Sequence, residues 1–370
     1  FFMTQGFGAF NDNVFKNALA ALLVFESSKM AGLNTDQLVN FSAMVFILPF
    51  FLFSALFGQF ADKYEKSMQI RRVKLLEVVI MLLATLGFWL DNVPLLMFVL
   101  FLLGLQSTIF GPIKYGILPR ILKREELVGG NALIEMGTFV AILGGTIAGP
   151  QLAGIEASWP YWASAACLAV AVTGYLFSLR IPPSPAVAPD LEISWNIFAE
   201  TVRNMKFINQ NRTVLNSVLG ISWFWFFGAI FLVQIPSYTQ NVLGGDKHLM
   251  SALLALFIIG ISTGSLLCER LSGKQVEIGL VPFGAIGLTL FGLDLYFASP
   301  EAPVAGITVM EFLADGNNWR IVIDLLLIGT FGGFYICLLY SSDAADDDTI
   351  VGVGGGGGWG VRGGGGGGGG

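Results

Sequence analysis

Ten long apolar runs, each close to twenty residues, constrain this chain more than any other feature of its sequence. A helix that crosses a lipid bilayer needs about 20 consecutive, mostly apolar residues. The pattern therefore predicts an all-α membrane protein with ten spanning helices. The expected spans are residues 1–25, 40–61, 73–91, 94–118, 131–154, 158–180, 214–241, 248–270, 276–298 and 319–340.

The composition agrees with a chain that is solvated mostly by lipid. Hydrophobic residues make up 54% of it and charged residues only 12%, with a mean hydropathy of +0.71. A soluble domain carries about 25% charged residues. The formal net charge of −6 includes four acids of the C-terminal segment, so the rest of the chain is close to balance. No basic patch with interleaved aromatic residues is present, and no nucleic-acid partner is expected.

Cysteine and histidine usage argues against an enzyme, a metal site or a bound cofactor. Cys167, Cys268 and Cys337 are isolated in apolar runs, where a thiol is usually a small buried hydrophobe. The single histidine, His248, has no second histidine or cysteine near it and stands in a short polar connection. Zinc hydrolysis and Ser-His-Asp catalysis both need more than this.

The positions of the basic residues predict the orientation. With the N-terminus in the cytoplasm, the connections on the cytoplasmic side hold 14 basic residues and the opposite connections hold three. Such an excess is typical of cytoplasmic loops. The cytoplasmic set is Lys63, Lys66, Arg71, Arg72, Lys74, Arg120, Lys123, Arg124, Arg180, Arg203, Lys206, Arg212, Arg270 and Lys274, and the opposite set is Lys29, Lys247 and Arg320.

A long linker divides the spans into six and four. Residues 181–213 begin with a proline-rich stretch, which is stiff and extended. Trp195, Phe198, Val202 and Met205 then share one helical face, which predicts an amphipathic helix on the inner membrane surface. The expected parts are an N-terminal bundle at 1–180, this linker, and a partial C-terminal bundle at 214–340. Residues 341–370 carry no interpretable pattern, because 15 of the last 19 are glycine.

Three motifs at matching spans resemble those of the major facilitator superfamily. Gly58, Asp62 and Lys63 follow the superfamily's Gly-x-x-x-Asp-Arg/Lys loop pattern, although Glu65 stands where a second glycine belongs. Residues 264–270 look like a weaker copy in the second half, and the glycines of residues 137–150 resemble the glycine-rich fifth helix. The resemblance implies a fold of two six-helix bundles, with Asp62 capping a neighbouring helix. Spans 11 and 12 of such a fold are then missing from the readable sequence.

Three further segments are similar to bacterial lysophospholipid transporters: residues 4–13, 61–66 and 105–116. This resemblance implies a flippase of the inner membrane that carries lysophospholipids from the outer to the inner leaflet by alternating access. It also implies membrane lipids as surroundings and an acyltransferase/acyl-carrier-protein synthetase as partner.

The first span has a polar stripe. Asp12 and Lys16 lie four residues apart on one helical face, with Asn13 beside them. We expect this stripe to line a cavity in which Asp12 receives a lipid amine. The alternative is that Asp12 and Lys16 simply neutralise each other.

The fourth span offers Gln106, Ser107 and Lys114, with Pro112 as a possible kink. Ser107 and Lys114 are seven residues apart and share a face, so Lys114 is a candidate phosphate partner that faces the same cavity as Asp12. The alternative for Lys114 is a lysine that reaches toward the cytoplasmic interface.

Two carboxylates complete the candidate substrate site. Glu135 in the fifth span pairs with Lys114 in the empty site, or forms a structural ion pair near the loop. Asp324 in the tenth span complements the charges of the first half. Glu77 is expected to be an interfacial or loop-pairing acid rather than a ligand, and Asp294 is expected at the membrane interface.

Other functions remain open from the sequence. A proton-coupled exporter of drugs or metabolites would use Asp12 and Glu135 as proton carriers, since burial favours protonation of a carboxylate. A scaffold for a lipid acyltransferase is also compatible with the pattern. A membrane acyltransferase is disfavoured, because no acid follows His248 at a suitable distance.

Overall fold

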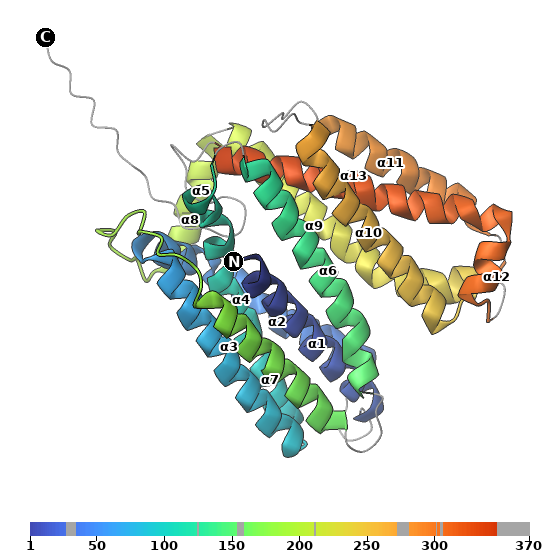
Figure 1. The fold of residues 1–370 in the computed structure, drawn as a ribbon, viewed down its shortest axis with the longest axis horizontal. Helices are drawn as coiled ribbons and strands as arrows, with labels where there is room; N and C mark the ends of the chain where they lie inside the picture. The colour runs from blue at the N-terminus through green and yellow to red at the C-terminus, as the bar shows by residue number, and fades with distance from the viewer. Residues whose placement is uncertain are drawn as a thin grey trace, which may run out of the picture.

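A computed structural model describes residues 1–26, 35–123, 126–153, 159–210, 212–271, 281–300, 302–303 and 306–345. The described chain is an assembly of long helices (Figure 1). The helices are α1 (Phe2–Glu26), α2 (Thr35–Lys63), α3 (Lys66–Trp89), α4 (Val93–Gly116), α5 (Leu118–Ile121), α6 (Leu127–Ala153), α7 (Trp159–Ser178), α8 (Ile197–Gln210), α9 (Arg212–Tyr238), η3 (Thr239–Leu243), α10 (Lys247–Leu271), α11 (Val281–Ala298), α12 (Val309–Ala314), η5 (Gly316–Asn318) and α13 (Trp319–Ala345).

The expected spans correspond to ten long helices within the described residues. Eight of them, α2, α4, α6, α7, α9, α10, α11 and α13, are long and apolar enough to cross a membrane. Helices α1 and α3, with 25 and 24 residues, are long enough but carry more polar and charged side chains. The polar residues of α1 and α3 turn inward, as the site described below shows, so lipid is not required to solvate them.

Polar caps set the starts of several helices. The side chains of Glu65, Asn92 and Asn196 accept hydrogen bonds from the first turns of α3, α4 and α8. Asp246 does the same for α10, at 2.8 Å from the backbone nitrogen of Leu249. Such caps satisfy amide groups that have no partner inside the helix.

Two boundaries differ from the expected ones. Helix α3 begins at Lys66, so the basic residues expected in the connection after the second span lie in helices: Lys63 ends α2, and the other four belong to α3. Lys66 and Lys74 are 0% and 1% exposed, and the interpretation of Lys74 as a loop residue is wrong. Helix α13 continues beyond 340 to Ala345, whereas the remaining glycine-rich residues lie outside the described part of the chain, as do Lys29, Arg124 and Lys274.

The helices before the linker pack closely on one another. Helix α1 lies along α6 and α7, α2 lies along α4, and α3 lies along α4 and α7 (Figure 1). The contact between α1 and α6 depends on the glycines of α6. A Cβ at Gly145 would lie 2.7 Å from the carbonyl oxygen of Phe10 and 2.9 Å from the backbone nitrogen of Val14. Only glycine therefore allows the two backbones to approach at this level.

The helices after the linker form a second group around α13. Helix α13 packs along α10 and α11, and α9 contacts α13 more lightly (Figure 1). Gly264 belongs to the segment that resembles a second loop motif. In the structure it serves a helix contact, because a Cβ there would lie 2.6 Å from the carbonyl carbon of Thr330 in α13.

The two groups meet along α6. This helix contacts α10 and α13 of the second group. Phe139 of α6 stacks on Trp225 of α9 at a centroid distance of 5.9 Å and meets Phe224 edge to face at 6.2 Å. Phe224 of α9 is therefore buried within the protein, whereas Phe226 of the same helix is 66% exposed.

Helix α8 exposes its apolar side and buries its polar side. Phe198, Val202 and Met205 are 77%, 52% and 61% exposed, while Glu200 and Asn204 are buried against the protein. Exposed apolar residues in this arrangement are typical of a helix that lies in the membrane surface. Helices α5 and α8 lie at one end of the molecule and α12 lies at the other (Figure 1).

Candidate functional site

A buried ion pair is the centre of a polar cluster between α1, α3 and α4. The Nζ atom of Lys74 lies 2.7 Å from Oε2 of Glu77, and both side chains are 1% exposed. The Nδ2 group of Asn11 donates to Oε1 of Glu77 at 3.0 Å, and Nε2 of Gln106 donates to Oε2 at 3.4 Å. Three donors from three helices therefore surround this carboxylate, which a buried charge requires. We call these four residues the Glu77 cluster.

Asp12 joins this cluster through Ser107. The Oγ of Ser107 donates to Oδ2 of Asp12 at 2.6 Å, and it also lies 3.1 Å from Oε1 of Gln106. The other carboxylate oxygen of Asp12, Oδ1, is buried and has no hydrogen-bond partner in the protein. Asp12 therefore keeps one acceptor available for a donor such as an amine.

Lys16 and Asn13 form a neighbouring contact. The Nζ of Lys16 donates to Oδ1 of Asn13 at 3.0 Å and lies 5.8 Å from the ring centroid of Phe46. Asn13 in turn donates to the carbonyl oxygen of Ala9 at 2.8 Å. Within the described residues no ion pair joins Lys16 directly to Asp12.

Lys114 is the centre of a second polar cluster, between α1, α4 and α6. Its Nζ donates to Oγ1 of Thr138 at 2.8 Å and lies 5.0 Å from the ring centroid of Tyr115. Thr138 lies 3.1 Å from Oε1 of Gln5, and Nε2 of Gln5 donates to the carbonyl oxygen of Ile134 at 3.3 Å. Lys114 is 9% exposed. An ammonium has three donors, and the described residues supply one hydrogen-bond acceptor to this one.

Glu135 lies beside Lys114 but binds another residue. The hydroxyl of Tyr115 donates to Oε1 of Glu135 at 2.7 Å, while Oε2 is buried without a partner. The Nδ2 of Asn131, one turn earlier in α6, is likewise buried and unpartnered. The direct pair between Glu135 and Lys114 is absent from the ion pairs of the described residues. We call Gln5, Lys114, Tyr115, Asn131, Glu135 and Thr138 the Lys114 cluster.

The two clusters occupy two levels of one helix seam. Gln5 and Asp12 are seven residues apart on α1, and Ser107 and Lys114 are seven residues apart on α4. Seven residues correspond to about 10 Å along a helix axis. Pro112 is buried within α4 between these levels. Asp12 and Lys114 therefore stand at different heights and make no direct contact with each other.

Asp324 lies apart from both clusters. It is 2% exposed in α13, and its Oδ2 is buried without a partner. Asp294 of α11 is paired with Arg320 of α13, one turn before Asp324. No hydrogen bond among the described residues connects Asp324 to α1, α4 or α6.

The loop motif after α2 holds the linker. Gly58 and Asp62 are buried, and Lys63 is the last residue of α2. The carbonyl oxygen of Asp62 accepts from the backbone nitrogens of Val187 and Ala188, at 3.0 and 2.9 Å. The N-cap residue of α3 itself is Glu65.

Glu65 connects this helix start to the linker. Its carboxylate accepts from the backbone nitrogen of Met68 at 2.8 Å and from that of Ser184 at 2.7 Å. Burial opposes ionisation of Glu65, but hydrogen bonds from the Ser67 hydroxyl and from the amides of Ser184, Met68 and Ser67 outweigh it. The pKa of Glu65 is therefore lowered from its ordinary value.

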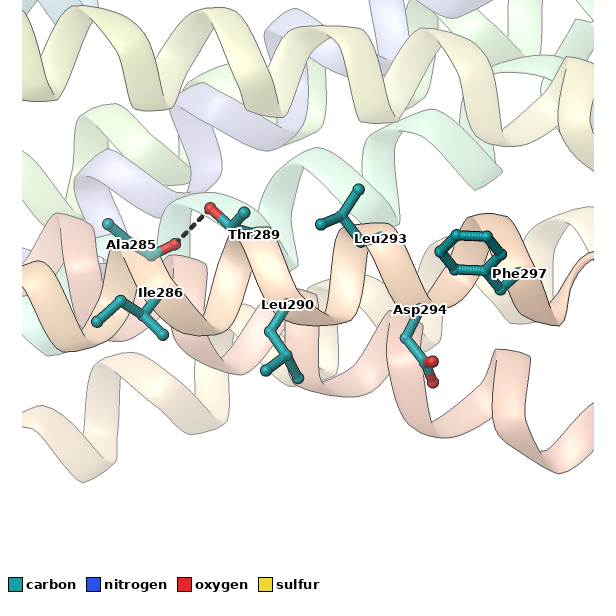
Figure 2. A pocket seen from close by; sticks show the side chains of 7 residues that line it. All are labelled: Ala285, Ile286, Thr289, Leu290, Leu293, Asp294 and Phe297. Carbon is teal, nitrogen blue, oxygen red and sulfur yellow. Dashed lines mark hydrogen bonds between the residues drawn. The ribbon is translucent and has the colours of Figure 1, made fainter.

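A hollow of about 590 Å³ lies along α11, far from both clusters in the sequence. All of its lining residues come from α11, so it is a shallow surface rather than an enclosed site (Figure 2). Its polar groups are already bound: Thr289 donates to the carbonyl oxygen of Ala285 at 2.9 Å, and Asp294 is paired with Arg320. We interpret this surface as lipid-facing.

Glu77 has a larger part in the site than the sequence interpretation gave it. It was expected as an interfacial or loop-pairing acid; it is 1% exposed and pairs with Lys74, one of the basic residues that had been assigned to that loop. Its spacing from Lys74, i to i+3 on one helix, was the available signal. Thr138 and Gln5 are ordinary polar residues in apolar helices, and their contact with Lys114 depends on the packing of three helices. In the described residues, no group of histidine, cysteine and acidic side chains is suited to hold a metal ion.

Comparison with known proteins supports this picture. A sequence profile described as the Major Facilitator Superfamily matches residues 1–348. Three similar proteins are named lysophospholipid transporter LplT. They come from Photorhabdus laumondii (26% identical), Enterobacter sp. strain 638 (28%) and Escherichia coli O157:H7 (27%), and each match covers 90% of this chain and 76% of the relative.

Solved structures share the fold at low identity. The proton:xylose symporter XylE is similar with a TM-score of 0.64 and 13% identity, over 96% of this chain and 82% of that one. A bacterial homologue of the iron transporter ferroportin reaches 0.59 and 14%, over 93% and 84%. These neighbours carry unrelated solutes, so the fold alone does not choose a substrate. The profile, the helical architecture and the named relatives agree, and the chain belongs to the major facilitator superfamily of membrane transporters.

Proposed function

We propose that this transporter is a flippase for lysophospholipids, which it carries from the outer to the inner leaflet of a bacterial inner membrane by alternating access. The observation that carries the proposal is the pair of incompletely satisfied charges on the α1–α4 seam. Lys114 has donors to spare, and Oδ1 of Asp12 has no partner.

The chemistry of these two groups suits a phospholipid head group. Lys114 is the proposed partner of the phosphate, because an ammonium binds phosphate through charge-assisted hydrogen bonds. Asp12 is the proposed partner of an amine such as that of ethanolamine. The spacing of about 10 Å along the seam suits a head group that passes from one level to the other. Glu135 and Asp324, each with an unpartnered buried oxygen, are proposed to contribute at later stages of the cycle.

The relatives' printed names support the substrate class, at 26–28% identity. The positive-inside distribution supports a cytoplasmic N-terminus, and the exposed apolar face of α8 supports its placement on the cytoplasmic surface. In the proposed arrangement, residues 1–180 and residues 214–340 form two bundles that rock about the substrate site. Residues 181–213 are the linker between them. Gly58, Asp62, Lys63 and Pro112 are proposed gating residues.

The lipid that this transporter would deliver to the inner leaflet indicates a partner enzyme. Lysophospholipid that reaches the inner leaflet must be re-acylated to remain in the bilayer as a two-chain lipid. We therefore propose that an acyltransferase/acyl-carrier-protein synthetase works beside this chain.

The test is uptake of labelled lysophospholipid by proteoliposomes that contain the purified protein. We expect uptake to exceed that of protein-free liposomes and to depend on Lys114. Uptake that collapses with the proton gradient would favour a proton-coupled mechanism. Gradient-driven movement of small solutes with no lysophospholipid uptake would replace the proposal with a proton-coupled exporter. Absence of any transport, together with binding of the synthetase, would indicate a scaffold.

A further inference from the structure

An apolar groove runs between α1 and α6 on the outer side of the first bundle. Its volume is about 350 Å³, and its walls are the side chains of five α1 residues and five α6 residues. Helices α1 and α6 lie side by side (Figure 1). Met3 and Val140, one from each wall, are 50% and 52% exposed, so the groove opens to the surroundings of the bundle. In a membrane these surroundings are lipid.

The groove backs directly onto the Lys114 cluster. Gln5 and Thr138, which lie 3.1 Å apart, are neighbours in sequence of the groove residues Gly6 and Gly137. Thr138 also accepts the hydrogen bond of Lys114, so a single hydrogen bond joins this cation to the residue that follows Gly137 of the groove wall. A cation therefore lies on one side of the contact between α1 and α6, and an apolar groove lies on the other. Together they suit an amphiphile with an anionic head and a single apolar chain.

We propose that this groove binds the acyl chain of a lysophospholipid while Lys114 receives its phosphate. The inference rests on the proposed function and assigns the tail site that the function requires. Gln5 and Thr138 lie between the head and the tail, so their contact opens to let the glycerol pass, and the phosphate takes over the contact that Lys114 makes with Thr138. The hollow along α11 is the alternative tail site, but Arg320, the cation beside it, is already paired with Asp294 of the same hollow.

The glycines of the groove give a selective test. A Cβ at Gly6 would have no atom within 4 Å, so a larger side chain at this position enters open space in the groove without a clash. Gly292 of α11 is also open, with no atom within 4 Å, and it supplies the matched control. Gly6→Phe therefore fills the groove, whereas Gly292→Phe adds the same side chain elsewhere.

The first measurement is uptake of palmitoyl and octanoyl lysophospholipids by proteoliposomes of each variant. For Gly6→Phe we expect the KM for the palmitoyl substrate to rise by about tenfold, equivalent to about 1.4 kcal/mol, with a much smaller change for the octanoyl substrate. Val140→Trp, which fills the groove from its exposed rim, should show the same preference. Gly292→Phe should resemble the parent. Equal losses for both chain lengths would overturn the tail site.

The second measurement is photo-crosslinking of a lysophospholipid that carries a diazirine at the end of its chain. We expect crosslinks in peptides that contain residues 2–10 and 136–144. Crosslinks on α11 instead would overturn the inference. Because crosslinking reports binding, it also separates the two proposals. Labelling in the groove without any uptake would refute the flippase and keep the tail site. Uptake with labelling elsewhere would keep the flippase and refute the tail site.

Discussion

Lys74 and Glu77 form an ion pair inside the first bundle, with 2.7 Å between Nζ and Oε2 and with both side chains 1% exposed. Asn11 of α1 and Gln106 of α4 complete the coordination of the carboxylate. The pair therefore joins three helices directly beside Asp12. Its loss should lower both the stability of the fold and the rate of transport.

Removal of one partner of this pair should be costly. Lys74→Met leaves Glu77 buried without its counter-charge, and we expect a loss of about 3–5 kcal/mol in the free energy of unfolding. The double variant Lys74→Met with Glu77→Gln should recover much of this loss, because no unpaired charge remains. Thermal unfolding in detergent measures both. Arg320→Ala is the control, since Arg320 and Asp294 are 52% and 36% exposed in their ion pair, which should contribute little to stability. Equal stability of the single and double variants would contradict this account.

Lys114→Ala should abolish or strongly reduce uptake of lysophospholipids that bear a phosphate, without unfolding the protein. A charge-assisted hydrogen bond contributes about 1.5–3 kcal/mol, which corresponds to about a ten- to hundredfold increase in KM. Uptake kinetics in proteoliposomes measure this effect. Lys206→Ala, at an exposed position of α8, is the matched control. Normal uptake by Lys114→Ala would remove the phosphate role.

Asp12→Asn should discriminate between head groups. Asparagine keeps the shape of the side chain and can still accept from Ser107, but it loses the charge that attracts an amine. We expect lysophosphatidylethanolamine uptake to fall more than lysophosphatidylglycerol uptake, because only the first carries an amine. Paired uptake of the two lipids is the measurement. An equal fall for both would indicate a structural role for Asp12.

Protonation of Glu65 at low pH should weaken the contact between the linker and the start of α3. Because the folded-state pKa of Glu65 is lowered from 4.5, its contribution to stability is complete above that value and is lost as the pH falls below it. Hydrogen exchange at the amide of Ser184 should therefore accelerate below a pH of about 4.5. In Glu65→Gln, which keeps an acceptor but does not titrate, this acceleration should be absent. The same pH profile in both proteins would exclude Glu65 as the cause.

The proposed orientation can be checked with single cysteines. Asp190 in the linker before α8 and Asn317 just after α12 are both exposed, and α8 and α12 lie at opposite ends of the molecule (Figure 1). A membrane-impermeant maleimide should label Asn317→Cys in intact cells and Asp190→Cys only after permeabilisation. The native cysteines are buried and supply the background control. Labelling in the reverse order would place the N-terminus outside.

The sequence predicts the helices well because lipid imposes a length and a composition on each of them. It predicts buried charge poorly. Lys74 was assigned to a loop because a basic residue near a helix end usually lies there, whereas its environment depends on Asn11 and Gln106, which are distant in the sequence. The contact between Glu65 and the linker shows the same limit. Glu65 departs from the loop motif, and its second role is visible only once Ser184 is seen to donate to it.

Asp12 and Lys114 were recognisable because they are charged residues within long apolar runs. Their contacts were not predictable, because the sequence does not show that Ser107 binds Asp12, that Thr138 binds Lys114, or that Tyr115 binds Glu135. Periodicity places a side chain on a face, but the neighbour across the seam is set by how three helices pack. The expected contact of Glu135 with Lys114 failed for this reason: the nearby hydroxyl of Tyr115 binds the carboxylate.

The hydrogen bonds of the linker have a consequence for its mechanics. Ser184, Val187, Ala188 and Ser194 are bonded to α2, to its last turn or to the residues that start α3. This stretch of the linker is therefore fastened to the first half of the molecule. Helix α8, whose apolar side faces outward, packs on α2 and on α9, so it lies where the two halves meet, and a movement of one half relative to the other must change its contacts with at least one of them.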